Sequence, residues 1–355
     1  MNNIENQLYS KVATLLENAR TQVVSTVNLT MVITYFEIGR TIIEDEQQGE
    51  LRAEYGKQVL KELSEKLKLR FGKGFSVDNL QNMRKFFLSF SKYETVSSIL
   101  QNNDNQLIEN KNNTINKTPM FQLSWSHYLV LMRIENLQER RFYEIEAVAQ
   151  NWSLAQLNRQ YQASLYERLA LSRDKNEVLK LAKQGQTIDK PQDILKNPLT
   201  LDFLGLGEKV TYSETDLEQR IITKLQDFLL ELGKGFLFEA RQKRFTFDNE
   251  HFFVDLVFYN RLLQCYVLID LKIDKLSHQD LGQMQMYVNY FDRFEKQEFE
   301  KPTIGILLCK KKNSNLVELT LPKEANIYAS EYSLYLPDKV ILQQKLNDWI
   351  SELEE

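Results

Sequence analysis

The chain has 355 residues, a length that suggests two domains or one large domain. Its composition, 43% hydrophobic and 26% charged, is typical of a globular protein. Its formal net charge of −4 gives no global basic character, so any binding of nucleic acid has to depend on local basic patches. Two cysteines and three scattered histidines argue against a structural zinc site.

The first residues are polar and lack the apolar core of a signal peptide, and no stretch approaches the length of a membrane span. Cys265 and Cys309 stand in apolar, strand-like runs, which is typical of buried thiols in a reducing compartment. We therefore expect a cytoplasmic protein that does not contact a membrane.

The first hundred residues have the apolar spacing of helices. One helix is predicted over residues 56–71, and the glycines of segment 72–74 end it. Ser76 is a good N-cap for the next helix, over residues 77–90. A helix, a glycine-containing turn and a capped second helix have the general layout of a helix-turn-helix.

The most basic stretch of the chain overlaps these helices. Residues 57–92 contain nine Lys or Arg against three Asp or Glu. Lys73, Arg84 and Lys85 are the candidate contacts for a DNA backbone there. A solvated face of amphipathic helices would have the same composition, and the sequence favours neither interpretation.

Two polar segments divide the chain. Residues 101–119 include seven Asn among 19 positions and are predicted to form a flexible insertion. Residues 175–198 hold two of the six prolines and are predicted to link two domains. We therefore expect a helical domain over residues 1–174 and a second domain over residues 199–355.

After Pro198 the apolar spacing changes from a helical to a mixed pattern. A single amphipathic helix is predicted over residues 211–232, with Ser213 or Thr215 as its cap. Three strand-like runs follow, and then a helix, two shorter strands and a terminal helix. Their predicted ranges are 236–247, 251–260, 262–273, 277–294, 303–309, 326–329 and 338–353. This order predicts an α/β layer with helices packed on a mixed sheet.

Two of these strands carry charges at positions where an apolar side chain would be expected. Asp255 lies inside one apolar strand, while Asp270 and Lys272 end the next. Burying an isolated charge costs far more than a strand position gains, so these charges need partners or a metal ion. Asp270 and Lys272 point to one face because side chains alternate along a strand.

Folding the two strands into a hairpin places Asp255 opposite a residue near Asp270. The two carboxylates would then be about 5 to 8 Å apart if they share a face. That spacing suits one Mg²⁺ ion, or Mn²⁺ in its place, with water and phosphate oxygens as the remaining ligands. Such an ion neutralises a phosphate oxygen and activates water, and Lys272 can assist the water. A structural Asp–Lys ion pair is the alternative.

Several flanking residues are further candidates for the site. Glu218 could reach the metal or could simply complement the helix dipole. Gln283 and Tyr287 share one helix face and could contact phosphate, although Tyr287 could also belong to the core. A basic strand formed by Arg241, Lys243 and Arg244 suits a nucleic-acid backbone, but a solvated edge strand would look the same.

The residues around these charges resemble a known family. Asp255 followed by Asp270-Leu271-Lys272 matches the PD-(D/E)XK nuclease motif, and segment 283–287 is similar to the Q-x-x-x-Y element of RecB-like members. Longer strings resemble the YhcG-like family of bacterial PD-(D/E)XK proteins over nearly the whole chain. These strings are YSETDLE (212–218), LGKGF (232–236), ARQKR (240–244), DLVFY (255–259), GFS (74–76), NMR (82–84) and LSWSH (123–127).

The resemblance implies a helical N-terminal domain with winged-helix character, which binds DNA or a partner, and a restriction-endonuclease-like α/β domain with a mixed central sheet. It implies that Asp255 and Asp270 are metal ligands and that Lys272 is the catalytic lysine. By the same match Glu218 would be the acid of the preceding helix, and Gln283 an accessory residue. Asp270 stands where many members carry Glu, and this shorter side chain would shift the metal slightly.

We therefore expect a Mg²⁺-dependent DNA endonuclease acting on branched, recombining or foreign DNA. A non-catalytic DNA-binding or adaptor protein on a nuclease-like scaffold is one alternative, although the intact Asp255, Asp270 and Lys272 set argues against it. An RNA-directed nuclease is another, and the absence of an RNA-module aromatic motif only slightly favours DNA. A homodimer would supply two active sites for two strands.

Overall fold

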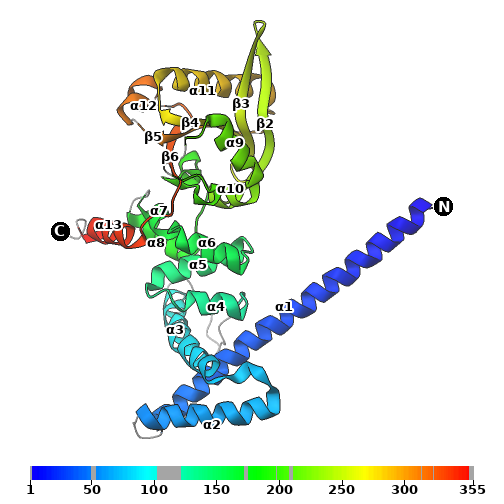
Figure 1. Ribbon diagram of the computed structural model, residues 1–355, viewed down its shortest axis with the longest axis vertical. Coiled ribbons are helices and arrows are strands. Elements are labelled where there is room, and N and C mark those ends of the chain that lie inside the picture. Colours follow the sequence, from blue (N-terminus) through cyan, green and yellow to red (C-terminus); the bar gives the residue numbers. More distant parts are fainter. Residues whose placement is uncertain are drawn as a thin grey trace. The chain divides into compact units, whose positions relative to one another are not determined.

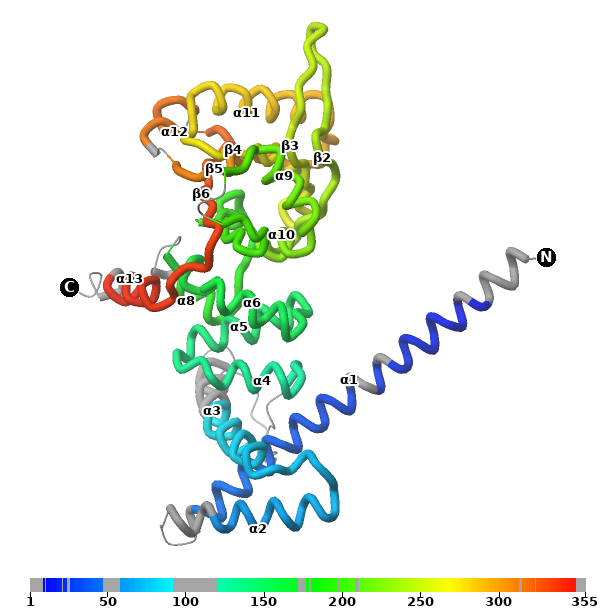
Figure 2. The backbone as a smooth tube through the Cα atoms, in the orientation of Figure 1, coloured from blue at the N-terminus to red at the C-terminus, as the bar shows by residue number. Residues whose placement is uncertain are grey.

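The polypeptide divides into two units, Met1–Arg140 and Arg141–Glu355, in the computed structural model (Figure 1). The described residues are 2–48, 53–101, 121–171, 175–196, 198–207, 211–312, 314–322 and 324–351, and Figure 2 follows the same path as a coloured tube. Nearly all of the Asn-rich segment 101–119 lies outside them. None of the described helices is long and apolar enough to cross a membrane.

The first unit is helical throughout its described residues. Its elements are α1 (Asn2–Gln48), α2 (Ala53–Phe71), the short 3-10 helix η1 (Lys73–Phe75), α3 (Val77–Gln101), α4 (Trp125–Leu131) and the start of α5 (Leu137–Ala149). A cluster of aromatic rings joins α1, α3 and α4, with Phe86 in contact with Phe36, Phe121 and Tyr128. This cluster is the centre of the unit because all four side chains are buried.

The helix-turn-helix order predicted for residues 56–90 is present in α2, η1 and α3. The Ser64 hydroxyl donates to the carbonyl of Phe75 at 2.8 Å, and the Ser76 hydroxyl accepts from the amide of Asn79 at 3.2 Å. These bonds fix the turn and cap α3. The resemblance also implied a wing, but no strand occurs in segments 2–48, 53–101 and 121–140.

The second unit begins with helices that the sequence placed in the N-terminal domain. They are the rest of α5, α6 (Leu154–Gln162) and α7 (Leu165–Ala170). After them come α8 (Lys175–Gln184) and the 3-10 helices η2 (Pro191–Ile194) and η3 (Asp202–Leu204). The predicted linker 175–198 thus contains α8 and η2. Val178, Leu181 and Ala182 are buried there. Their helical spacing was obscured by the polar residues around them.

A mixed sheet of six strands forms the body of the second unit, in the order β1-β6-β5-β4-β3-β2. The strands are β1 (Leu199–Thr200), β2 (Phe236–Phe247), β3 (Glu250–Asn260), β4 (Cys265–Lys275), β5 (Ile304–Lys311) and β6 (Ile327–Ser333). β2, β3 and β4 are antiparallel, whereas β4, β5, β6 and β1 are parallel. The mixed sheet expected from the sequence is therefore present.

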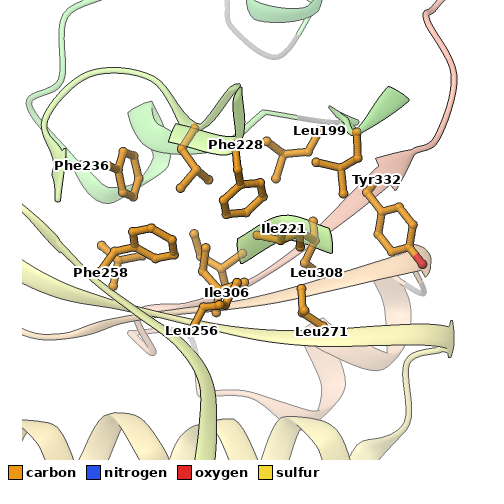
Figure 3. Packing of buried hydrophobic residues seen from close by; sticks show 14 of the residues in the cluster. Leu199, Ile221, Phe228, Phe236, Leu256, Phe258, Leu271, Ile306, Leu308 and Tyr332 are labelled. Carbon is orange, nitrogen blue, oxygen red and sulfur yellow. The ribbon is translucent and has the colours of Figure 1, made fainter. Parts of the chain in front are cut away.

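Helices cover both faces of this sheet. α9 (Glu214–Thr223) and α10 (Leu225–Leu232) pack on one face around Phe228 and Phe258 (Figure 3). α11 (His278–Tyr290) packs on the other, and a π-helical turn, η4 (Phe291–Glu295), continues it. Gly305 of β5 allows α11 to approach closely, since a Cβ atom there would lie 2.7 Å from Met284. α12 (Ser314–Thr320) and α13 (Lys339–Ser351) complete the unit.

The single helix predicted over residues 211–232 is wrong, because it is two helices that meet at Lys224. This residue leaves the helical conformation, with φ −113° and ψ 33°. The apolar spacing continues across the break, with Ile221, Phe228 and Leu232 all buried, so periodicity alone could not reveal it. The predicted cap is present, since Ser213 and Asp216 form a capping box at the start of α9.

The β2–β3 hairpin extends beyond the rest of the sheet (Figure 1). Pairing of β3 with β4 ends at Leu256 and Ile269, whereas pairing of β3 with β2 continues to Glu250 and Phe247. β3 and β4 therefore diverge just beyond Leu256. Asp255 is the first residue of β3 past this fork.

Candidate active site

Asp255 and Asp270 face each other at the fork between β3 and β4. Each is the next residue beyond the last backbone pair, Leu256 with Ile269. The amide of Leu271 donates to Asp255 Oδ2 at 2.8 Å. The Asp255 side chain thus accepts a hydrogen bond from β4 at a point where the backbones of β3 and β4 no longer pair. The sequence-based expectation that the hairpin would bring the two acids opposite each other matches this register.

Asp270 is almost fully buried, with 3% of its surface exposed. Burial raises the pKa of its carboxyl group to about 7, and the charge of Asp255 adds to the effect, while Lys272 opposes it. The Lys272 ammonium lies 2.8 Å from Asp270 Oδ2 and forms an ion pair with it, and this buried oxygen accepts no hydrogen bond from a neutral donor. An oxygen of this kind is suited to a cation.

Lys272 lies among three carboxylates. Besides Asp270, Glu214 of α9 and Asp280 of α11 each have an oxygen 3.8 Å from its Nζ atom. Burial lowers the pKa of Lys272, but the charge of Asp270, helped by those of Glu214 and Asp280, outweighs burial and raises the pKa above its ordinary value. Lys272 is therefore a cation at neutral pH in this arrangement.

Glu218 approaches the pair of aspartates from α9. It is 4% exposed, and Arg241 of β2 donates from Nε to its Oε1. Gln242 donates from Nε2 to Glu218 Oε2 at 2.6 Å and from the same nitrogen to Asp255 Oδ1 at 2.9 Å. Glu218 thus contacts Asp255 through Gln242. The sequence predicted Glu218 but missed Gln242, because a glutamine between two basic residues has no distinguishing pattern.

Gln283 and Tyr287 share one face of α11, as their spacing predicted. The Gln283 amide donates to the Tyr287 hydroxyl, which donates in turn to the carbonyl of Phe253 at 2.9 Å. Tyr287 is 1% exposed and is part of the hydrophobic core that α11 forms with the sheet. Its core alternative is therefore the one that the structure favours over a phosphate contact.

Two of the three basic residues predicted in β2, Arg241 and Lys243, form ion pairs with acidic side chains. Arg241 also donates to Gln219 of α9 at 2.7 Å. Lys243 forms ion pairs with Glu239 at 2.9 Å and Glu295 at 3.5 Å, and these raise its pKa. Arg244 is exposed on the extended part of the hairpin. Of the three, Arg244 is best placed to meet a phosphate backbone.

The basic candidates of the first unit differ in the same way. Lys73 in η1 and Lys85 in α3 are exposed. Arg84 is held by Glu46, with an Nε–Oε2 distance of 2.7 Å. Lys73 and Lys85 are thus the residues of this group that present charge to solvent.

Two carboxylates, rather than a preformed cluster, are what the site offers a metal ion. Within the described ranges no three His, Cys, Asp or Glu side chains gather at metal-binding spacing. Mg²⁺ is commonly held by one or two carboxylates and keeps several water ligands. The facing carboxylates of Asp255 and Asp270, with an Asp270 Oδ2 that accepts no hydrogen bond from a neutral donor, fit that requirement.

Comparison with known proteins decides the family. The chain is 39% identical over 359 aligned positions to YhcG of Escherichia coli (strain K12), a protein named provisionally as a nuclease, and the match covers 98% of this chain and 95% of that protein. It belongs to the YhcG family. Residues 192–347 match the YhcG PDDEXK nuclease domain, and residues 11–168 match the DUF1016 N-terminal domain.

Membership makes this chain a PD-(D/E)XK-type nuclease, and the sequence-based identification of the family is confirmed. Asp255, Asp270 and Lys272 all lie inside the matched nuclease domain. Two solved structures also align, a repair endonuclease from Pyrococcus abyssi and an EndoMS complex with double-stranded DNA. They share 18% and 17% identity, cover 37% of this chain and about half of theirs (50% and 48%), and have TM-scores of only 0.25.

Proposed function

We propose that this YhcG-family protein hydrolyses phosphodiester bonds of DNA with the help of Mg²⁺, for which Mn²⁺ can substitute. The observation that carries the proposal is the facing pair Asp255 and Asp270 with the Lys272 ammonium 2.8 Å from Asp270. A buried Asp270 and a half-buried Asp255 with one cation beside them have little structural use at the fork of a hairpin. They are the donor set that phosphodiester hydrolysis requires.

Each residue of this trio has a separate task in the proposal. Asp255 and Asp270 hold the divalent ion, which supplies charge neutralisation at a phosphate oxygen and a more acidic water. Asp255 is kept in place by the amide of Leu271. Lys272, held as a cation by its carboxylate neighbours, orients the attacking water and stabilises negative charge as it develops.

DNA is the proposed substrate because the sequence has no aromatic motif of an RNA-binding module. Arg244 on the extended hairpin and Lys73 and Lys85 in the first unit are the proposed backbone contacts, since their side chains are exposed. A homodimer would supply one active site for each strand of a duplex. Branched or foreign DNA is the proposed form of the substrate.

The test is a cleavage panel with labelled linear duplex, fork, four-way junction and single-stranded DNA, and single-stranded RNA, each with Mg²⁺, Mn²⁺ or EDTA. We expect metal-dependent cleavage of one DNA form, reduced on the order of 100-fold or more in Asp270→Ala and in Lys272→Ala. Asp274→Ala and Lys275→Ala are matched controls, because both residues are exposed at the end of the same strand. These controls should cleave like the wild type.

Other outcomes would favour the alternative functions. Cleavage that survives Asp270→Ala or Lys272→Ala would contradict the site assignment. Binding of DNA at low salt without cleavage of any substrate would favour an adaptor, and cleavage of RNA alone would favour an RNA-directed nuclease.

A further inference from the structure

Gln242 occupies an unusual place in β2. Its backbone has φ +47°, the left-handed region that a residue with a Cβ atom seldom adopts. The neighbours on either side pair regularly, Arg241 with Leu256 and Lys243 with Val254, so the register places Gln242 opposite Asp255 of β3. An earlier irregularity at Glu239 has already shifted the register. The strand is thus deformed beside the active site.

From this position the Gln242 amide reaches two acids. Its Nε2 atom lies 2.6 Å from Glu218 Oε2 and 2.9 Å from Asp255 Oδ1. Ionised carboxylates only accept hydrogen bonds, so the nitrogen, with its two N–H groups, has to face them. One neutral group therefore connects the acid of α9 with the acid of β3.

We propose that Gln242 is a positioning residue that fixes the Asp255 carboxylate for metal binding by tying it to Glu218. This inference rests on the proposed metal-dependent function. Asp255 is then held from two sides, by the amide of Leu271 at Oδ2 and by Gln242 at Oδ1. Arg241 anchors the other end of the link at Glu218 Oε1.

The residue type suits this task. A lysine in the same place would also bind both acids, but its positive charge would repel a divalent cation. Glutamine donates two hydrogen bonds without adding charge, so the carboxylates keep their attraction for the metal. Groups that orient a metal ligand in this way commonly change metal affinity 10- to 100-fold when they are removed.

The experiment measures Mn²⁺ binding to the full chain by titration calorimetry. Gln242→Gly removes the side-chain amide, and glycine adopts the left-handed backbone without strain. If Gln242 served only to shape the backbone of β2, this variant would bind Mn²⁺ as tightly as the wild type. We expect instead that its Kd for Mn²⁺ rises roughly 10- to 100-fold. Gln242→Asn tolerates the same backbone but has a shorter side chain, and its Kd should also rise.

A matched control is available in the same domain. Gln264, in the turn between β3 and β4, also has a left-handed backbone, with φ +55°. Gln264→Gly should therefore leave the Kd for Mn²⁺ unchanged. In cleavage assays the Gln242 variants should need more Mn²⁺ for half-maximal rate and should recover most of the rate at saturation.

Wild-type affinity for Mn²⁺ in folded Gln242→Gly would overturn the inference, and so would wild-type affinity in Gln242→Asn if the Gly variant does not fold. This failure differs from failure of the proposed function, in which the wild-type protein itself neither binds Mn²⁺ nor cleaves DNA.

Discussion

At the scale of single residues, Tyr287 separates a structural from a catalytic assignment. Burial raises the pKa of its hydroxyl to about 12, and the charges of Asp270 and Asp255 add to the effect, although Gln283 opposes it. The hydroxyl donates to the carbonyl of Phe253, in the part of β3 beyond the fork. Tyr287 therefore attaches the extended hairpin to α11 and stays un-ionised at neutral pH.

Tyr287→Phe tests this assignment. The variant should lose about 0.5–1.5 kcal/mol of unfolding free energy, because the Phe253 carbonyl loses its donor. Metal-dependent cleavage at saturating Mg²⁺ should stay close to the wild-type rate. Urea unfolding and a cleavage assay measure the two effects, and a large loss of rate without loss of stability would point to a phosphate contact instead.

Some candidate site residues could be recognised from the sequence alone. Asp255, Asp270 and Lys272 could be found because charges inside apolar strands are conspicuous, and hairpin pairing brings them together. Gln242 could not be found, since its left-handed backbone and its contact with Glu218 of α9 leave no mark in the pattern of polar and apolar residues. Local deformation of a strand is decided by tertiary contacts.

At the scale of elements, a buried ion pair joins α7 and α10. Arg168 donates to Glu231 with both terminal nitrogens, at 2.6 and 3.2 Å, and both side chains are almost fully buried. Glu231 also accepts from the amide of Thr200 in the edge strand β1 at 2.9 Å. Burial raises the pKa of Glu231, but the charges of Arg168 and Lys196 outweigh burial and lower the pKa below its ordinary value.

Arg168→Met should destabilise the second unit by about 3–5 kcal/mol at pH 7, because Glu231 loses its main partner. A carboxyl with a lowered folded pKa stabilises the protein above its unfolded pKa, about 4.3, and this contribution is lost as pH falls through the folded pKa. In the variant, burial dominates and the folded pKa rises. Urea unfolding should therefore show a smaller difference from wild type at pH 5 than at pH 7.

Lys190→Met is the control for this prediction, since it removes a half-exposed ion pair with Glu177 in the same unit. It should cost about 0–1 kcal/mol. An equal loss in both variants, or a difference from wild type that does not change with pH in Arg168→Met, would contradict the assignment of Glu231 as a buried, ionised partner.

Elements were predicted as well as their local signals allowed. The range given for β2 is the observed one, because Gly235 and the turn at Asp248 bound an uninterrupted strand pattern. The helix break at Lys224 was missed, because the apolar spacing runs on across it. The Lys224 amide still donates to the carbonyls of Arg220 and Ile221, so the two helices stay joined. Continuity of a hydrophobic face does not require continuity of a helix.

At the scale of the whole molecule, the helical N-terminal region and the mixed sheet followed from the order of helices and strands, whereas the domain boundary stays a prediction. The sequence indicated a linker at residues 175–198, whereas the contacts divide the chain after Arg140. The matched family regions leave a gap between residues 168 and 192. Gln160 of α6 donates to the carbonyl of Leu230 and Arg168 of α7 donates to Glu231, so these helices belong to the second unit through partners distant in sequence.

The central claim is that Asp255 and Asp270 together hold one divalent ion in this nuclease. Crystals of the full chain grown with Mn²⁺ test it directly through the anomalous difference map. One strong peak is expected between the two carboxylates, lost in Asp270→Asn and retained in the control Asp274→Asn. A map with no peak there, or a peak bound by other residues, would contradict it.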